Sequence, residues 1–396
     1  MYNRLKILLS HNFYRSSRPS GEDVVYRNER ALLESHADVI PYERFNDSID
    51  ESTLGKKLQL ALDGAWSRHT YTELSALIKH RRPDIAHFHN TFPLISPSAY
   101  AACRDNGVPV VQTLHNFRLI CPGGLLMRDG RPCEDCVGTN LLPALRYRCY
   151  RGSLPATGAL VWMLMSNRWQ GAYQTLVNRY IALTAFAASR LIAGGLPTDR
   201  ISIKPNFAPD LSEPGPGDGG YAVYVGRLSA EKGLLTLFSA WKLLPHIPLK
   251  ILGDGPLRQE LTDLAIQTKL PVEFLGFCDS PRIIDMMGRA ALLVVPSEWY
   301  EGFPMVVLEA YACGTPVVCS RIGSLNEIVE EGVAGVKFDP GNPQDLAEKV
   351  QMLWDNSERR KSMRGTVRKT YENNYSAEKN FQDLMRIYEK TMGSCA

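Results

Sequence analysis

A short segment near residue 300 constrains the fold most, because it joins a buried strand, a tight turn and a helix. The apolar run Ala291-Leu-Leu-Val-Val-Pro296 is typical of a buried strand. The run Ser297-Glu-Trp-Tyr-Glu301-Gly-Phe-Pro-Met-Val-Val-Leu-Glu309-Ala follows it and leads into a helix that ends at Gly314-Thr-Pro. Glu301 therefore precedes the helix, and Glu309 lies about two turns inside it.

The beginning of this helix predicts an anion site. Backbone N–H groups at Phe303 to Val306 would have no partner inside the helix and would point toward the same place. The carboxylates of Glu301 and Glu309 can accept hydrogen bonds from hydroxyl groups. This combination suits a ligand that carries both phosphates and hydroxyls, such as a nucleotide-sugar.

A second strand-to-helix segment carries the matching positive charge. Tyr221-Ala-Val-Tyr-Val-Gly226 reads as a strand, and a helix begins at Leu234. Gly226 has no side chain, so a ligand can approach the backbone. Arg227 offers a planar fork of donors and Lys232 a compact charge, and together they could hold a diphosphate as it leaves.

The two motifs together resemble the retaining GT-B glycosyltransferases of family four. The resemblance rests on Gly226-Arg-Leu-Ser-Ala-Glu-Lys-Gly233 followed by Glu301-Gly-Phe-Pro and Glu309-Ala, is strongest over 221–339, and is looser in the N-terminal half. It implies an α/β fold of two Rossmann-like, doubly wound domains that face a deep cleft. We expect an acceptor-binding domain over 1–207, a nucleotide-sugar domain over 208–375, and a last helix in 376–396 that crosses back to the first domain.

Alternating strands and helices in the sequence agree with this expectation. In the first domain we expect strands at Leu5–Leu9, Val39–Ile40, Ile85–Phe88, Val110–Leu114, Arg179–Leu183 and Ile201–Lys204, and helices at Asp23–Glu34, Trp66–Lys79 and Pro97–Asp105. The Pro- and Gly-rich run 208–220 is the expected linker. The second domain repeats the alternation, with strands at Ala222–Val225, Leu249–Leu252, Val272–Leu275, Leu292–Val295, Val317–Val318 and Gly335–Phe338.

The resemblance also implies a role for individual residues. Glu309 would bind the ribose hydroxyls, and the catalytic candidates are Glu301, which would contact the transferred sugar, and His115, which would lie near its reacting carbon. The residues expected at the donor diphosphate are Arg227, Lys232, Gly302, Phe303, Pro304, Met305, Val306 and Gly21. The family's loop after the first strand corresponds to His11–Asp23, where Ser20-Gly21 replaces the usual double glycine. Cys278 and Ser280 are the nucleobase candidates. His87 and His89 fit the acceptor cleft or a strand cap.

The implied reaction retains the anomeric configuration, and the leaving diphosphate helps to deprotonate the acceptor hydroxyl. The sequence has no Asp-x-Asp motif to hold a divalent ion, so we expect neither a metal nor a catalytic cofactor. The co-substrate would be a nucleotide-diphosphate sugar, with a UDP-sugar favoured over a GDP-sugar. The acceptor would be a glycan or a lipid-linked molecule of cell-surface polysaccharide or glycolipid synthesis.

Charge and composition bear on the partners. The chain has 396 residues, 44% hydrophobic and 22% charged, as in a soluble two-domain protein. Residues 1–207 carry 25 Lys and Arg against 17 Asp and Glu, whereas the remainder carries 20 against 25. A basic first half suits an anionic acceptor or an anionic membrane surface, although ordinary charge scatter stays open. The apolar run 154–166 fits either a buried helix or one lying on a membrane.

Neither a secretory signal nor an apolar run long enough to span a bilayer is visible in the sequence. We therefore expect a cytoplasmic protein, with peripheral contact to the inner face of the plasma membrane as a hypothesis, and no nucleic-acid partner. Four of nine cysteines, Cys121, Cys133, Cys136 and Cys149, cluster in one loop-rich segment. Their spacing is compatible with structural zinc or with reduced, partly buried thiols.

Other functions use a similar architecture. A nucleotide-sugar epimerase would bind the same ligand without an acceptor, but the pairing of Arg227 and Lys232 with Glu301 and Glu309 argues against it. A dinucleotide dehydrogenase is weakened because no Gly-x-Gly-x-x-Gly follows the first strand. A non-catalytic sugar-nucleotide-binding subunit stays open, although all four donor-site charges are present.

Overall fold

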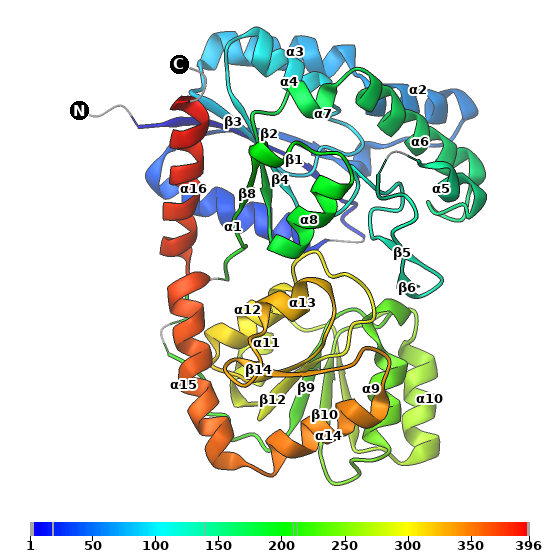
Figure 1. The fold of residues 1–396 in the computed structure, drawn as a ribbon, viewed down its shortest axis with the longest axis vertical. Helices are drawn as coiled ribbons and strands as arrows, with labels where there is room; N and C mark the ends of the chain where they lie inside the picture. Colours follow the sequence, from blue (N-terminus) through cyan, green and yellow to red (C-terminus); the bar gives the residue numbers. More distant parts are fainter. Residues whose placement is uncertain (1–3, 18–19, 139, 209, 212, 394–396) are drawn as a thin grey trace. The chain divides into compact units, whose positions relative to one another are not determined.

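The computed structural model describes residues 4–17, 20–138, 140–208, 210–211 and 213–393. The chain divides into two compact units (Figure 1). The first contains residues 1–126, 134–205 and 381–396, and the second contains 127–133 and 206–380. The second unit thus begins two residues before the expected boundary, and it also takes in 127–133 from the cysteine-containing segment. Each unit is an α/β layer structure with one parallel sheet flanked by helices, as expected from the sequence.

The first unit is built on a six-stranded sheet in the order β2-β1-β3-β4-β7-β8. Its strands are β1 (Lys6–Phe13), β2 (Asp38–Phe45), β3 (Ile85–Phe88), β4 (Val110–Leu114), β7 (Arg179–Ala182) and β8 (Ile201–Ile203). Its α-helices are α1 (Gly21–His36), α2 (Leu54–Ala65), α3 (Arg68–Arg81), α4 (Ser98–Asp105), α5 (Leu142–Arg146), α6 (Leu154–Trp169), α7 (Ala172–Thr175) and α8 (Ala185–Ala193), with short 3₁₀ turns η1 (Asn46–Ser48) and η2 (Thr198–Arg200). The pairing within this sheet is parallel throughout.

Strand β1 is longer than the sequence predicts. Its register with β2 runs from Lys6↔Asp38 to Phe13↔Phe45 without a break. His11 is therefore a buried strand residue and not the first residue of a loop. The apolar pattern ends earlier because the strand continues through the polar side chains Ser10, His11 and Asn12, all of which are buried.

The end of the chain contributes to the core of the first unit. The last helix, α16 (Ala377–Gly393), begins in the second unit and ends in the first. Its side chains Leu384, Ile387 and Tyr388 join a core cluster with β-strand residues Ile7 and Leu9. Burial of this apolar surface attaches the end of the helix to the first sheet.

The second unit has a six-stranded parallel sheet in the order β11-β10-β9-β12-β13-β14. Its strands are β9 (Ala222–Val225), β10 (Leu249–Leu252), β11 (Val272–Gly276), β12 (Leu292–Val295), β13 (Val317–Ser320) and β14 (Gly335–Phe338). Its helices are η3 (Ala230–Lys232), α9 (Leu234–Trp241), α10 (Arg258–Thr268), α11 (Ser280–Arg289), α12 (Met305–Ala312), α13 (Gly323–Ile328), α14 (Pro343–Trp354) and α15 (Ser357–Asn374). A small antiparallel pair, β5 (Met127–Arg128) and β6 (Arg131–Pro132), is grouped with it.

Strand order reverses once in each sheet. In the first sheet the chain passes from β1 to β2 in one direction and through β3 and β4 in the other. In the second sheet the reversal lies between β9 and β12. Loops at the carboxyl ends of such strands diverge and leave room for a ligand. Both candidate sites described below lie at these positions. No helix within the described ranges combines the length and apolar character needed to cross a bilayer.

Gly233 allows two loops of the second unit to touch. It ends the η3 turn in the left-handed region, at φ +67°, and starts α9. A Cβ atom at this position would lie 1.8 Å from the carbonyl oxygen of Pro296, which follows β12. Only glycine therefore permits the loop that carries Lys232 to approach the loop that carries Glu301.

Replacing Gly233 by Ala should destabilise the second unit by about 2–4 kcal/mol, through backbone strain and the clash with Pro296. Chemical denaturation followed by tryptophan fluorescence would measure this loss. The matched control is Gly365→Ala in α15, where a Cβ atom meets nothing within 4 Å and stability should rise by up to about 1 kcal/mol. Equal stability of the two variants would contradict the proposed role of Gly233.

Candidate functional site

The site in the second unit centres on an ion pair between two loops. Lys232 Nζ lies 2.6 Å from Glu301 Oε1, and Ser297 Oγ donates to the same oxygen at 2.6 Å. Glu301 is 6% exposed, so it is not a solvated glutamate at a helix end. The Lys232 ammonium also lies 5.4 Å from the ring centre of Trp299. These contacts hold the lysine at the carboxyl ends of β9 and β12.

Glu301 keeps one oxygen for other partners. Both hydrogen bonds fall on Oε1, and Oε2 makes none with any residue that the structure describes. Arg227 begins the same loop as Lys232, and its side chain is exposed and forms no ion pair with the described residues. The pair of cations therefore consists of one anchored ammonium and one guanidinium that extends into solvent.

Helix α12 supplies the predicted backbone donors. Its first residues are Met305 and Val306, and its N-cap, Pro304, makes no side-chain capping bond. Pro304, which the sequence placed among these donors, has no N–H, so the donors of this turn belong to its neighbours. Gly302 is held in place by Ser324 Oγ, which donates to its carbonyl oxygen at 3.2 Å. Phe303 packs its ring against the apolar core and leaves its backbone at the helix start.

Glu309 lies about one helical turn into α12 and not two, because the helix starts only at Met305. Burial raises the pKa of its carboxyl group above the ordinary value. Its carboxylate has no hydrogen bond or ion pair with any described side chain. An acid that is removed from water and lacks a partner in the protein is suited to accept hydrogen bonds from a bound ligand.

The nucleobase candidates differ in what they expose. The Cys278 side chain is buried in the core, where its thiol lies near the carbonyl oxygens of Leu275 and Gly276, so only its backbone could meet a ligand. Ser280 is exposed as the first residue of α11. Between β11 and α11 lies Phe277, with 84% of its surface exposed. No motif in the sequence marks this aromatic side chain as a candidate for the nucleobase site.

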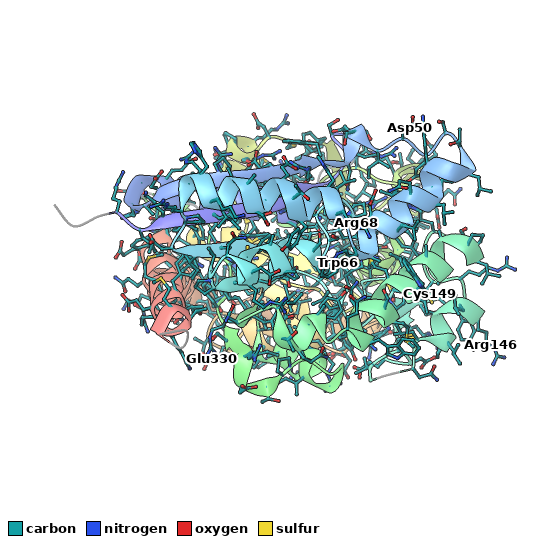
Figure 2. All side chains as sticks on the ribbon, turned by 90° about the horizontal axis from the view of Figure 1, so that it is seen from above. Asp50, Trp66, Arg68, Arg146, Cys149 and Glu330 are labelled. Carbon is teal, nitrogen blue, oxygen red and sulfur yellow. The ribbon has the colours of Figure 1, made fainter. Side chains whose placement is uncertain are left out.

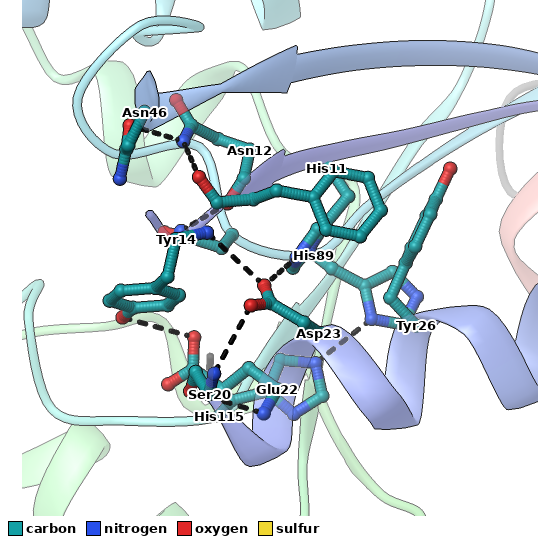
Figure 3. A network of polar contacts seen from close by, with 12 residues as sticks. His11, Asn12, Tyr14, Ser20, Glu22, Asp23, Tyr26, Asn46, His89 and His115 are labelled. Atoms are coloured by element: carbon teal, nitrogen blue, oxygen red, sulfur yellow. Dashed lines mark hydrogen bonds and ion pairs between the residues drawn. The ribbon is translucent and has the colours of Figure 1, made fainter. Parts of the chain in front are cut away.

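The site in the first unit contains His115, which directly follows β4. Its Nε2 lies 2.9 Å from Nδ1 of His89, and the two rings stack with centres 5.1 Å apart (Figure 3). Burial, together with the neighbouring His89 and His11, holds the pKa of His115 well below its usual value. The ring is therefore neutral near pH 7 and can form directional hydrogen bonds.

A pocket of about 570 Å³, including its open mouth, borders His115 and His89. Its lining mixes apolar side chains such as Tyr100 and Met163 with polar ones. The Gln112 side-chain oxygen is buried there and has no hydrogen-bond partner in the described structure. Glu22 accepts from Asn116 Nδ2 at 2.8 Å (Oε1) and from the Tyr14 hydroxyl at 3.3 Å (Oε2), and burial raises the pKa of its carboxyl group. This lining can hydrogen-bond a small polar molecule and also cover an apolar face.

The two other histidine predictions have different outcomes. His89 lines the pocket, whereas His87 lies fully buried within β3. His87 Nδ1 pairs with the Tyr388 hydroxyl at 2.7 Å and Nε2 with Thr113 Oγ1 at 2.8 Å. Burial lowers the pKa of His87 to about 3. It is a neutral core histidine and does not reach a ligand.

Gly21 is the first residue of α1, after the Ser20 N-cap. A Cβ atom there would meet nothing within 4 Å, and the residue is exposed. Its backbone conformation does not require glycine. Asp23 completes the capping box and also accepts from the Tyr14 N–H and pairs with His11 at 2.9 Å (Figure 3). The contact between this loop and donor phosphates stays a prediction.

Glu29, His87 and His89 form the one close group of three metal-ligating side chains among the described residues. Lys204 Nζ lies 3.0 Å from Glu29, and every ring nitrogen of the two histidines already has a polar partner. A cation would be repelled by the ammonium, so this cluster fits a hydrogen-bond network better than a metal. Cys121, Cys133, Cys136 and Cys149 form no such group of metal-ligating side chains within the described ranges.

Sequence comparison assigns the two halves of the chain separately. The family model "Glycosyl transferases group 1" matches residues 212–370, and the model "Glycosyltransferase Family 4" matches residues 54–209. Together the two matches cover well over half of the chain. The chain belongs to the GT-B glycosyltransferases of family four.

Two relatives of this glycosyltransferase illustrate the extent of the similarity. This chain is 34% identical over 175 residues to an uncharacterized glycosyltransferase of Methanocaldococcus jannaschii. The aligned region covers 44% of this chain and 49% of that protein. The chain is 29% identical to D-inositol 3-phosphate glycosyltransferase 1 of Catenulispora acidiphila, over 71% of this chain and 66% of that protein. The match to the archaeal relative spans about half of that protein's length.

The fold is also similar to solved structures. The Anabaena protein HepE in complex with UDP superposes with a TM-score of 0.67 at 19% identity, over 98% of this chain and all of that one. At this identity the likeness establishes the fold of the glycosyltransferase and not its substrates.

Proposed function

We propose that this protein transfers a sugar from a nucleotide-diphosphate sugar to a hydroxyl group of a glycan or lipid-linked acceptor. The observation that carries the proposal is the anchored Lys232 beside the start of α12. There a lysine, an exposed arginine and free backbone donors lie at the reversal point of one sheet. Three positive features of this kind favour a diphosphate, and they can stabilise it as a leaving group.

The two glutamates extend the donor site. Glu309 would accept hydrogen bonds from the ribose hydroxyls, and the free Oε2 of Glu301 would accept one from the transferred sugar. Lys232 would then link the two halves of the donor, because it touches Glu301 and carries the charge that a diphosphate needs. The structure of HepE holds UDP, and another holds UDP-glucose, which favours a UDP-sugar over a GDP-sugar in this protein too.

The chemical step would proceed with retention and without a metal. The paired cations and the helix N-terminus provide the charge stabilisation that a divalent ion gives in other transferases. His115 would hold a sugar hydroxyl in place. A nucleotide-sugar epimerase and a non-catalytic subunit would bind the same donor. Product analysis separates these possibilities, because only a transferase yields a new glycoside and a free nucleoside diphosphate.

Calorimetry with UDP and GDP should show that one nucleotide binds. Replacing Arg227, Lys232 or Glu309 by Ala should each weaken this binding about 10- to 100-fold, since each removes one charged hydrogen bond of about 1.5–3 kcal/mol. The exposed residues Lys361 and Glu348 in the same unit serve as controls, and their alanine variants should bind normally. Normal binding by all three site variants, or no binding of either nucleotide by the wild type, would contradict the proposed donor site.

We further propose that the first unit meets an anionic membrane through α2 and α6. These two helices pack against each other. Leu54 and Leu58 on α2 are 83% and 60% exposed, and Trp162 and Trp169 on α6 are 46% and 88% exposed. So much apolar surface on neighbouring helices is unusual for a face that meets only water.

Basic side chains also lie on these helices and on their neighbour. Lys56, which pairs with Asp50, and Lys57 lie on α2, and Arg146 ends α5, which packs on α6. Figure 2 shows Asp50, just before α2, and Arg146 at the same end of the first unit. Leucine and tryptophan side chains that enter the interface, with basic groups at the phosphates, are the features of a helix that binds an anionic bilayer. Gly64 of α2 and Met163 of α6 also line the pocket beside His115, so a lipid-borne acceptor would lie close to that histidine.

Cosedimentation with phosphatidylglycerol-containing vesicles should show binding by the wild type and little binding to neutral phosphatidylcholine vesicles. The variant Leu54→Gln with Leu58→Gln should bind at least about tenfold more weakly, because each leucine contributes about 1–2 kcal/mol when it leaves water. Ile266→Gln, which alters a 70% exposed side chain in the second unit, is the control. Equal binding by both variants would contradict the assignment of this face, and altered self-association of the leucine variant would instead indicate contact with a second copy.

A further inference from the structure

A chain of buried charged and polar side chains lies behind His115. Lys204 Nζ is 3.0 Å from Glu29 Oε2, Glu29 Oε1 is 3.0 Å from His89 Nε2, and His89 Nδ1 is 2.9 Å from His115 Nε2. Lys204, Glu29 and His89 are each at most 2% exposed. They come from the end of β8, from α1 and from the end of β3, so distant parts of the sequence meet at the first sheet's reversal point.

We propose that Lys204, Glu29 and His89 are positioning residues that hold His115 in a single tautomer, with a proton on Nε2 and none on Nδ1. The role of that tautomer in sugar transfer rests on the function proposed above, whereas the tautomer itself does not. His115 would then offer Nδ1 as a hydrogen-bond acceptor to a hydroxyl group in the adjoining pocket.

The direction of each hydrogen bond follows from the ionisation of Glu29. Burial alone would raise the pKa of Glu29, but the Lys204 ammonium and the hydrogen bond with His89 lower it well below its ordinary value. A carboxylate has no proton to donate, so Nε2 of His89 must carry the hydrogen of the bond that joins them. The charge of Glu29 is already matched by Lys204.

Charge balance determines the next hydrogen bond of the network. Because Lys204 already balances Glu29, the buried groups carry no net charge when His89 holds a single proton, and that proton is the one on Nε2 that points to Glu29. Nδ1 of His89 is therefore an acceptor, and His115 Nε2 must donate to it. In a neutral His115 the other ring nitrogen, Nδ1, is left without a proton. It makes no hydrogen bond with the residues that the structure describes.

The other groups around Lys204, Glu29 and His89 are compatible with this tautomer of His115. His87 Nδ1 lies 3.3 Å from Glu29 but bonds the Tyr388 hydroxyl, and its other nitrogen meets Thr113. His11 pairs with Asp23, stacks on Tyr26 and has its ring centre 6.2 Å from that of His89. Neither ring is bonded to His115, so His89 is its specific partner in the network (Figure 3).

Nitrogen-15 NMR of histidine-labelled full-length protein at pH 7 measures the tautomer without any substrate. The wild type should give a His115 spectrum with a protonated Nε2 and an unprotonated Nδ1. The signal is assigned by its loss in His115→Gln, which is practical because the chain has eight histidines. A His115 spectrum of the opposite tautomer would overturn the proposal, whatever the donor or acceptor of the enzyme proves to be.

The paired variant Glu29→Gln with Lys204→Met removes both charges together and leaves neither one unpaired. An amide can donate or accept, so His89 is free to reverse its proton, and His115 should show both tautomers. In a transfer assay kcat should fall at least about tenfold, as for other residues that orient a reactive group, while KM for the donor stays unchanged.

Tyr388→Phe is the matched control, because it removes a buried hydroxyl from His87 but leaves the bonds from Lys204 to His115 in place. Its His115 spectrum should equal that of the wild type. The His115 spectrum could instead be unchanged in the Glu29 and Lys204 variant, or change equally in Tyr388→Phe. Either result would show that the hydrogen bonds from Lys204 to His89 do not set the tautomer of His115.

Discussion

The reversal of strand order within each parallel sheet determines where this protein can bind ligands. Loops at the carboxyl ends of β1 and β3 lead in opposite directions, and so do those of β9 and β12. Loops that diverge in this way leave room for a ligand, and in the first unit a pocket borders His115 at this position. The two clusters of ionisable side chains in the chain's candidate sites, one around His115 and one around Lys232, occupy these positions. The polar groups of each cluster lie at the carboxyl ends of strands whose apolar side chains form the core of that unit.

The two sites use charge differently. In the second unit, Lys232 is neutralised by Glu301 yet stays 25% exposed, so a more strongly anionic ligand could attract it. In the first unit, Lys204 and Glu29 are fully buried and neutralise each other. A pair of the first kind can respond to a ligand, whereas a pair of the second kind holds its neighbours in fixed positions. This difference separates the residues that would touch the donor from those that would orient His115.

Much of the second unit follows from the sequence. The motif from Gly226 to Gly233 and the segment from Glu301 to Glu309 predict their strands, turns and helices, since glycine, proline and apolar runs act locally. Local pattern also predicts His115 at the end of a strand. The Glu301–Lys232 pair requires only that two neighbouring strands end together, which a parallel sheet ensures.

The network behind His115 does not follow from the sequence. Lys204 and Glu29 are 175 residues apart, and neither differs in local pattern from an ordinary surface charge. Tyr388, near the end of the chain, meets His87 in the core, again without a local signal. Helix α2 could have been predicted because Leu54, Leu58 and Leu62 recur every four residues, which is typical of one face of a helix. Exposure of these leucines is a property of the tertiary structure and cannot be deduced from their spacing.

A crystal structure of the protein with UDP would show whether the second unit binds a nucleoside diphosphate between its two loops. We expect the diphosphate within hydrogen-bond distance of Lys232, Arg227 and the first N–H groups of α12, with the ribose hydroxyls on Glu309. A nucleotide bound elsewhere, or one whose phosphates avoid both cations, would contradict this expectation.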